Sequence, residues 1–425
     1  MKNRGRHRRP SWWSRQFGAR TLTSGGDPGG STRHWAALDG MRAFAVIAVM
    51  IFHFYIPTLL PGGFLGVDVF FVLSGFLITS LLIGEEGKYQ RIDVKAFYIR
   101  RALRLLPALL AMMAVFTLVV DLVPSAQYYR HDSFTAIPFV LLYVGNWWRI
   151  GHSLGVFDHT WSLAIEEQFY ILFPALFIFC MRRKMRRINI AKALVVAALA
   201  EIVLRSILLA AGSAINTIDN TTVTHSDGLL FGAALAFWLT STERRQIRTG
   251  TVHVFAVVAV AVLVALVAAT SFASPFWYDF GITAAPIATA VLLFDQVTTP
   301  LPWLARVLGS KPAVWIGRRS YGLYLWHAPI YKIVILIPGR THVRGSDVIV
   351  FVGSFLAAIV SFEIIEKPAL RVKARFQKTE ATPSSLAPSI HARHAGDQVE
   401  VVPEKSGRHA ISAQAISASV SSPHQ

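Results

Sequence analysis

Residues 251–270 read TVHVFAVVAVAVLVALVAAT, a stretch in which two threonines and one histidine are the only polar side chains. About 20 helical residues cross the ~30 Å hydrocarbon core of a bilayer. Similar apolar stretches recur along the 425-residue chain, in which 53% of the residues are hydrophobic and 16% are charged. A typical soluble domain has about a quarter charged residues. The sequence therefore predicts an all-α polytopic membrane protein, with the lipid bilayer as its main partner.

The hydropathy pattern predicts about ten transmembrane helices. The segment 135–148 is also apolar, but a full span there would place the basic run 181–187 opposite the other basic segments. We therefore predict one short re-entrant or broken segment at this point, since irregular backbone at membrane depth is tolerated inside the protein or against a watery cavity. An ordinary span is the alternative. The ten predicted helices lie near residues 41–58, 64–83, 103–123, 162–180, 192–211, 225–240, 251–270, 280–296, 320–337 and 347–366.

The formal net charge of +18 is distributed unevenly between the loops. Alternate segments contain 32 lysines and arginines, whereas the segments between them contain 4. This asymmetry follows the positive-inside rule, and it predicts a multi-pass protein of the inner (plasma) membrane with both termini in the cytoplasm. Because topology accounts for the charge, we expect no nucleic-acid partner. The basic segments are 1–34, 85–104, 181–192, 241–250, 297–319 and 367–378.

Composition divides the chain into three parts. Residues 1–34 are expected to form a basic, disordered tail, and no removable signal peptide is recognisable in them. Residues 35–370 form the membrane domain, and residues 371–425, rich in Ser, Ala, Pro and His, are expected to be a disordered cytoplasmic tail. Cys180 is the only cysteine, so the chain has no internal disulfide. Any chemistry is therefore expected in the membrane domain.

The first predicted helix carries three ionisable residues. Such residues are costly in a bilayer unless they face a cavity or a partner. Arg42 and His53 are 11 residues apart, close to three whole turns, so they share a face about 16 Å apart along the axis. Asp39 lies one turn before Arg42. An imidazole at this depth can act as a base, nucleophile or proton carrier, and a hydrogen-bonded structural histidine is the alternative.

A second group of candidates combines arginines with carboxylates. Arg101 and Arg104 are one turn apart, and planar guanidinium groups suit two-point binding of phosphate; simple anchoring of a cytoplasmic loop is the alternative. Glu166 and Glu167 lie in the outer half of another predicted helix. A carboxylate beside an imidazole fixes its tautomer and raises its basicity, so Glu166 is the predicted partner of His53. A buried ion pair with an arginine of another helix is the alternative.

One further pair of ionisable residues falls inside a predicted span. Glu201 and Arg205 lie one turn apart in the predicted helix 192–211. Oppositely charged side chains at this spacing can neutralise each other on one helix face. We therefore expect them to pair with each other, and we assign them no role.

These motifs together resemble the membrane-bound acyltransferase-3 family. Five motifs follow in order over about residues 35–370, nearly all of the membrane part. Relatives often have an arginine two residues before the aspartate of the DGLL motif at 227–230, where this chain has His225. The five motifs are LDGMRA at 38–43 with His53, GVDVFFVLSGFLI at 66–78, FY at 97–98 with RALR at 101–104, TWSL at 160–163 with EEQFY at 166–170, and SYGLYLWH at 320–327.

The resemblance implies an integral-membrane O-acyltransferase that takes an acyl group, expected to be acetyl, from cytoplasmic acyl-CoA. The implied acceptor is a hydroxyl of a cell-envelope glycan, a glycolipid or a glycosylated small molecule. A macrolide-type antibiotic O-acyltransferase is the alternative within the family. A transporter or flippase, which would use the same buried charges as a substrate path, is the alternative outside it, although no internal repeat typical of transporters is seen.

The resemblance, with the residue patterns above, gives each candidate a role. His53 and Glu166 are expected to be catalytic, and no metal is expected. The arginines expected to bind acetyl-CoA are Arg42, Arg101 and Arg104. The supporting residues are expected to be Asp39, Asp68, Trp161, Ser162, Glu167, Tyr324 and His327.

Overall fold

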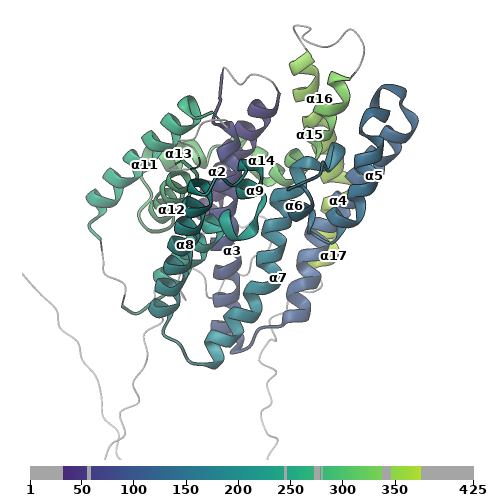
Figure 1. Cartoon of the computed structure of the whole chain (residues 1–425). Coiled ribbons are helices and arrows are strands. Elements are labelled where there is room, and N and C mark those ends of the chain that lie inside the picture. Colours follow the sequence, from purple (N-terminus) through teal and green to yellow (C-terminus); the bar gives the residue numbers. More distant parts are fainter. Residues whose placement is uncertain are drawn as a thin grey trace, which may run out of the picture. The chain divides into compact units, whose positions relative to one another are not determined.

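The computed structural model describes residues 32–54, 59–243, 247–271, 278, 281–336 and 346–374, and none of these lies in a β-strand (Figure 1). The longer helices are α2 (Thr32–His53), α3 (Gly66–Tyr89), α4 (Val94–Leu122), α7 (Trp161–Arg182), α8 (Arg187–Ala210), α10 (Asp227–Leu239), α11 (Thr249–Ala269), α12 (Ile282–Thr298), α15 (Ser320–Ile335) and α16 (Ser346–Ser361). Every predicted helix overlaps one of them.

Short helical segments connect these helices. The α-helical ones are α5 (Arg130–Leu141), α6 (Gly145–Trp148), α9 (Ile215–Asn220), α13 (Pro302–Leu308), α14 (Lys311–Arg318) and α17 (Lys367–Ala374). The tighter 3₁₀ turns are η1 (Gly63–Leu65), η2 (Pro124–Tyr129), η3 (Gly155–Thr160) and η4 (Thr222–Thr224), and a π-helical turn, η6 (Phe362–Glu366), continues α16.

The helix lengths confirm a polytopic membrane protein, although they do not confirm ten spans. In the described ranges, seven helices are long and apolar enough to cross a membrane. An eighth span results if α12 and α13, which are bent by 100° at their junction, are taken together. The helix α10 has 13 residues and α15 has 16, fewer than the roughly 20 that a straight span needs.

The apolar segment 135–148 is short and interrupted, as predicted. The helix α5 ends at Leu141, and α6 adds a single turn from Gly145. Between them Tyr143 has a φ of 54°, in the left-handed region that few non-glycine residues adopt. Neither helix is long enough to span a bilayer by itself.

The predictions for the two tails fall mainly outside the described residues. At the C-terminal boundary the structure corrects the sequence, because α17 continues to Ala374 and residues 371–374 are helical rather than part of a disordered tail. At the N-terminal boundary α2 already begins at Thr32, inside the segment assigned to the first tail.

The helices α3 and α10 pack in direct backbone contact. A Cβ atom built on Gly75 would lie 2.0 Å from the carbonyl oxygen of Leu229, and one built on Gly232 would lie 2.1 Å from that of Val72. No side chain fits at these distances, which is how small residues bring membrane helices together. The helix α3 also contacts α2, α7 and α12, so it connects the helix that ends at His53 with the helix that carries Glu166 and Glu167.

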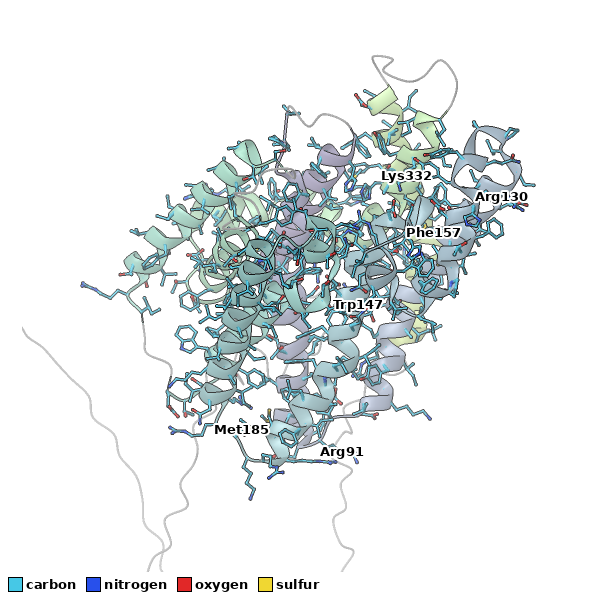
Figure 2. All side chains as sticks on the ribbon, viewed as in Figure 1. Arg91, Arg130, Trp147, Phe157, Met185 and Lys332 are labelled. Carbon is cyan, nitrogen blue, oxygen red and sulfur yellow. The ribbon has the colours of Figure 1, made fainter. Side chains whose placement is uncertain are left out.

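Labelled loop and helix residues identify the two opposite ends of the long helices. Figure 2 places Arg91 and Met185 at one end, which we call the basic end, and Lys332 and Arg130 at the opposite end, which we call the far end. The α3–α4 and α7–α8 connections lie at the basic end. The helices α2 and α4 therefore run from the basic end toward the far end, and α7 runs back.

Candidate active site

His53 is the last residue of α2 and lies half-buried in the protein interior. Its Nδ1 atom is 2.9 Å from the carbonyl oxygen of Val49. A carbonyl can only accept, so Nδ1 carries the hydrogen and Nε2 has the free lone pair. The imidazole packs edge-on against Phe52 at 5.3 Å and against His327 at 5.0 Å between ring centroids. The predicted catalytic histidine thus faces another imidazole rather than the lipid.

His327 on α15 is fully buried, and it has the same tautomer. Its Nδ1 atom is 2.8 Å from the carbonyl oxygen of Tyr324 and 3.2 Å from that of Leu323. Its Nε2 atom has no hydrogen-bond partner in the described part of the chain. The ring of His159 in η3 lies 5.8 Å from His327. Three imidazoles from α2, η3 and α15 therefore meet at one place.

Tyr324 and Ser162, two of the predicted supporting residues, connect α15 to the start of α7. The Tyr324 hydroxyl lies 2.6 Å from Ser162 Oγ and 2.8 Å from the carbonyl oxygen of His159, to which it donates. Both side chains are buried. Closer to the far end, Lys332 donates to the carbonyl oxygen of Gly155 at 2.6 Å and pairs with Asp158 at 2.5 Å. These bonds hold η3, and with it His159, against α15.

The arginine region differs from the sequence prediction, because Arg101 and Arg104 are not equivalent. Arg101 is bound to Glu167 at 2.8 Å, and its guanidinium lies 3.6 Å from the centre of the Tyr170 ring. Arg104 is exposed, and within the described residues no ion pair is recorded for it. Among the charged side chains, Arg42 and Arg101 have the strongest electrostatic interaction with the Arg104 guanidinium, and both repel it. Arg104 thus lies near two other arginines, each of which has a carboxylate of its own, and its guanidinium is available to an anion.

Arg42 lies beside Asp39, which precedes it by one turn of α2. Its guanidinium is 3.6 Å from Asp39. Asp39 is in turn 3.5 Å from Arg318, which lies on α14. The helices α2 and α14 therefore share an ionic contact on the basic-end side of the histidines, and a supporting role for Asp39 stays a prediction.

Glu166 lies in the arginine region and not beside His53. It accepts from Ser74 at 3.1 Å and from Tyr170 at 3.5 Å, and it is 3.9 Å from Arg101. The charged side chains that interact most strongly with the His53 imidazole are Lys332 and Arg149, and Glu166 is not among them.

The predicted pairing of Glu166 with His53 is therefore wrong. The helix α7 runs toward the basic end, so Glu166 lies about 10 Å beyond η3, where His159 meets the other imidazoles. A catalytic role for Glu166 stays a prediction.

Residues 35–364 match the family model for the acyltransferase domain of the acyltransferase-3 family. The chain belongs to the acyltransferase-3 family. Among curated proteins it is similar to a putative peptidoglycan O-acetyltransferase, YrhL, of Bacillus subtilis (strain 168), with 36% identity over 353 residues, which are 79% of this chain and 55% of the relative.

Two further relatives carry related names. The O-acetyltransferase OatA of Staphylococcus aureus (strain NCTC 8325 / PS 47) is 35% identical over 388 residues, 85% of this chain and 63% of the relative. The peptidoglycan O-acetyltransferase OatA of Listeria monocytogenes serovar 1/2a is 33% identical over 355 residues, 80% of this chain and 56% of the relative. The chain thus spans between 55% and 63% of the length of these relatives. No solved structure is significantly similar to it.

In this acyltransferase-3 chain, the departure at His225 is compensated by its surroundings. His225 Nε2 is 3.3 Å from Asp68, and its Nδ1 is 2.8 Å from the carbonyl oxygen and 3.5 Å from the carboxylate of Asp219. Two carboxylates around one imidazole favour its protonated form. The ring of Trp161 packs 5.3 Å from His225. The structure thus places Asp68 and Trp161 against His225, and their supporting roles stay predictions.

Glu201 and Arg205 do not neutralise each other, contrary to the sequence prediction. Arg205 donates to Asp227 at 3.3 Å and to the carbonyl oxygen of Thr224 at 2.8 Å. Glu201 accepts from the backbone N–H of Ser226 and from that of Asp227, the latter at 3.1 Å. Free N–H groups at a helix start favour a carboxylate, so Glu201 binds the start of α10. Arg205 binds the Asp227 side chain in the same turn.

His159 is the site residue that the sequence interpretation missed. It stands in a polar turn before a predicted span, and no spacing rule relates it to His53 or His327. Lys332 and Asp158, which hold η3 in place, were missed for the same reason. Only the packing of η3 on α15 brings these side chains together, and this contact joins residues more than 160 positions apart.

Proposed function

We propose that this chain is an integral-membrane O-acetyltransferase that moves an acetyl group from acetyl-CoA to a hydroxyl of a cell-envelope glycan. The single observation that carries the proposal is the His53 imidazole, which lies on the same helix as Arg42, uses Nδ1 for the Val49 carbonyl and packs against His327. Family membership supports acyl transfer. The names of the relatives support peptidoglycan, or a similar glycan, as the acceptor.

The donor is proposed to bind from the basic end. Acetyl-CoA carries phosphate groups, and Arg104, exposed and close to the charges of Arg42 and Arg101, is a suitable partner for them. The flexible pantetheine arm would then cover the distance of about 16 Å along α2 from Arg42 to His53. The positive-inside rule assigns the basic end to the cytoplasm, where acetyl-CoA is found, and assigns the far end to the acceptor.

The reaction itself needs a nucleophile or base at the thioester. The thioester C–S bond breaks, an ester C–O bond forms, and the proton of the acceptor hydroxyl ends on the CoA thiol. His53 supplies this function either as a base toward the acceptor or as a transient carrier of the acetyl group. General-base assistance contributes roughly 10²–10⁴ in rate.

The activity is tested with the purified full-length chain in lipid nanodiscs. Radiolabelled acetyl-CoA and a soluble glycan acceptor are added, and CoA release and labelled glycan are measured. We expect both products in equal amounts, and neither with His53→Ala. If the wild-type protein moves acetyl-CoA or glycan across a vesicle membrane without releasing CoA, it is a transporter and the proposal is wrong.

The orientation is tested by cysteine labelling in whole cells with a membrane-impermeant maleimide. In a Cys180→Ser background, cysteines replace Met185 at the basic end and Tyr128 near the far end, which are 38% and 78% exposed. We expect Tyr128→Cys to be labelled in intact cells and Met185→Cys only after the cells are opened. The reverse pattern would place the donor side outside and remove cytoplasmic acetyl-CoA from the proposal.

A further inference from the structure

The unpartnered nitrogen of His327 marks a place for a hydrogen-bond donor. The side chain is 0% exposed, and its Nδ1 hydrogen is used by backbone carbonyls of α15. A buried polar atom without a partner is costly, and the great majority of such atoms are hydrogen-bonded. His53 cannot fill this place, because its own ring hydrogen is directed to the Val49 carbonyl.

The two facing imidazoles come from two different helices, which both run toward the far end. His53 ends the helix that carries Arg42, so it lies on the proposed donor path. His327 lies on α15 five residues, or about 7.5 Å, before Lys332 at the far end. Because the two rings lie 5.0 Å apart, an acetyl group on one imidazole is within reach of a hydroxyl that is hydrogen-bonded to the other.

We propose that His327 is the base that removes the proton of the acceptor hydroxyl, while His53 carries the acetyl group. This proposal rests on the proposed function and divides it into two steps between two residues. In the first step His53 Nε2 attacks the thioester carbonyl, a C–N bond forms, the C–S bond breaks, and CoA leaves as a thiolate.

In the second step the acceptor oxygen attacks the acetyl carbon as its proton passes to His327 Nε2. The C–O bond forms, and the C–N bond to His53 breaks, which restores the neutral imidazole with hydrogen on Nδ1. The proton on His327 finally neutralises the CoA thiolate. The sum is one glycan ester and one CoA thiol for each acetyl-CoA and hydroxyl consumed.

Isotope exchange separates the two steps in the full-length protein. The first step alone exchanges radiolabelled CoA into acetyl-CoA when no acceptor is present. The test variant is His327→Asn, whose amide can still donate to the Tyr324 carbonyl but cannot act as a base. We expect exchange within about twofold of wild type and transfer to the glycan lower by about 10²-fold or more. His53→Ala should lose both reactions.

A second acceptor and a control complete the experiment. Hydroxylamine attacks an acyl group without prior loss of a proton, so we expect His327→Asn to acetylate it at close to the wild-type rate. His152→Asn changes an exposed histidine outside the site and should leave all three reactions unchanged.

Three outcomes contradict the division of roles. An equal loss of exchange and transfer in His327→Asn makes the residue structural, and equal losses toward glycan and hydroxylamine remove it as a base. Absence of exchange in a wild-type protein that still acetylates glycan means that His53 carries no acetyl group. A wild-type protein that neither exchanges nor transfers contradicts the proposed function itself.

Discussion

Two clusters of polar side chains satisfy their buried polar atoms differently. They are the histidine cluster (His53, His159 and His327) and the arginine–glutamate cluster (Arg101, Glu166 and Glu167). Arg101 is satisfied by Glu167 and by the ring of Tyr170. The imidazoles of His53 and His327 instead each use Nδ1 for a backbone carbonyl, and Nε2 of His327 has no partner within the described residues. A buried charge that is fully paired fixes helices in place, whereas a buried lone pair without a partner is available for chemistry. Under the proposed function, the contrast separates residues that hold the fold from residues proposed to act on the substrates.

The largest expected effect is on turnover, in the histidine cluster. Replacing His53 with alanine should lower kcat/KM by at least about 10²-fold, because it removes the group that acts on the thioester. The midpoint of thermal unfolding in detergent should stay within about 2 °C of wild type, since His53 is half-buried and bonds only locally. His152→Ala is the matched control. Near-full turnover in His53→Ala would remove the residue from the mechanism.

The next effect is on stability, in the arginine–glutamate cluster. Glu167→Gln removes the negative partner of Arg101 and should lower the free energy of unfolding by about 1.5–3 kcal/mol, as expected for a hydrogen bond to a charged group. Denaturant titration in mixed micelles measures this loss, and the remaining folded protein should keep most of its kcat. A loss of kcat with unchanged stability would reverse the assignment of the two clusters.

A smaller effect should distinguish the two arginines of the RALR motif. Arg104→Ala should raise the KM for acetyl-CoA about tenfold with little change in kcat, because one charge-assisted contact to phosphate is worth about 1.4 kcal/mol. Arg104→Lys should recover part of the affinity. Initial rates at varied acetyl-CoA measure both values. An unchanged KM in Arg104→Ala would make the residue an anchor of the basic loop.

The smallest expected effect concerns the Tyr324 hydroxyl, which connects α15 to η3 and to the start of α7. Tyr324→Phe removes the bonds to Ser162 and to the carbonyl of His159 but keeps the ring. We expect kcat to fall threefold to tenfold, a loss of about 1 kcal/mol that is typical of one neutral hydrogen bond. Tyr128→Phe at an exposed position is the control. A loss as large as that of His53→Ala would mean that Tyr324 touches the reacting atoms.

Local periodicity was enough to predict the helices and the inward face of His53. Apolar stretches such as 251–270 specify a helix without help from the rest of the chain, and α11 (Thr249–Ala269) matches that stretch closely. Arg42 and His53 share a face because 11 residues are close to three turns. The number of spans was harder, because α10 and α15 are shorter than their apolar surroundings suggested.

Contacts between helices could not be predicted from spacing. Glu166 was assigned to His53 on chemistry alone, but its height on α7 places it beside Arg101. Glu201 and Arg205 have the spacing of an ion pair, yet the free N–H groups at the start of α10 compete for Glu201. In both cases the chemical group was recognised and its partner was set by the packing.

The glycine contact between α3 and α10 restricts how the protein can open. With Gly75 and Gly232 each seated on the partner's backbone, these two helices cannot slide or separate without losing a close-packed seam. They therefore form one rigid wall of the membrane domain. A covalent link engineered across this wall should stiffen the enzyme without closing it.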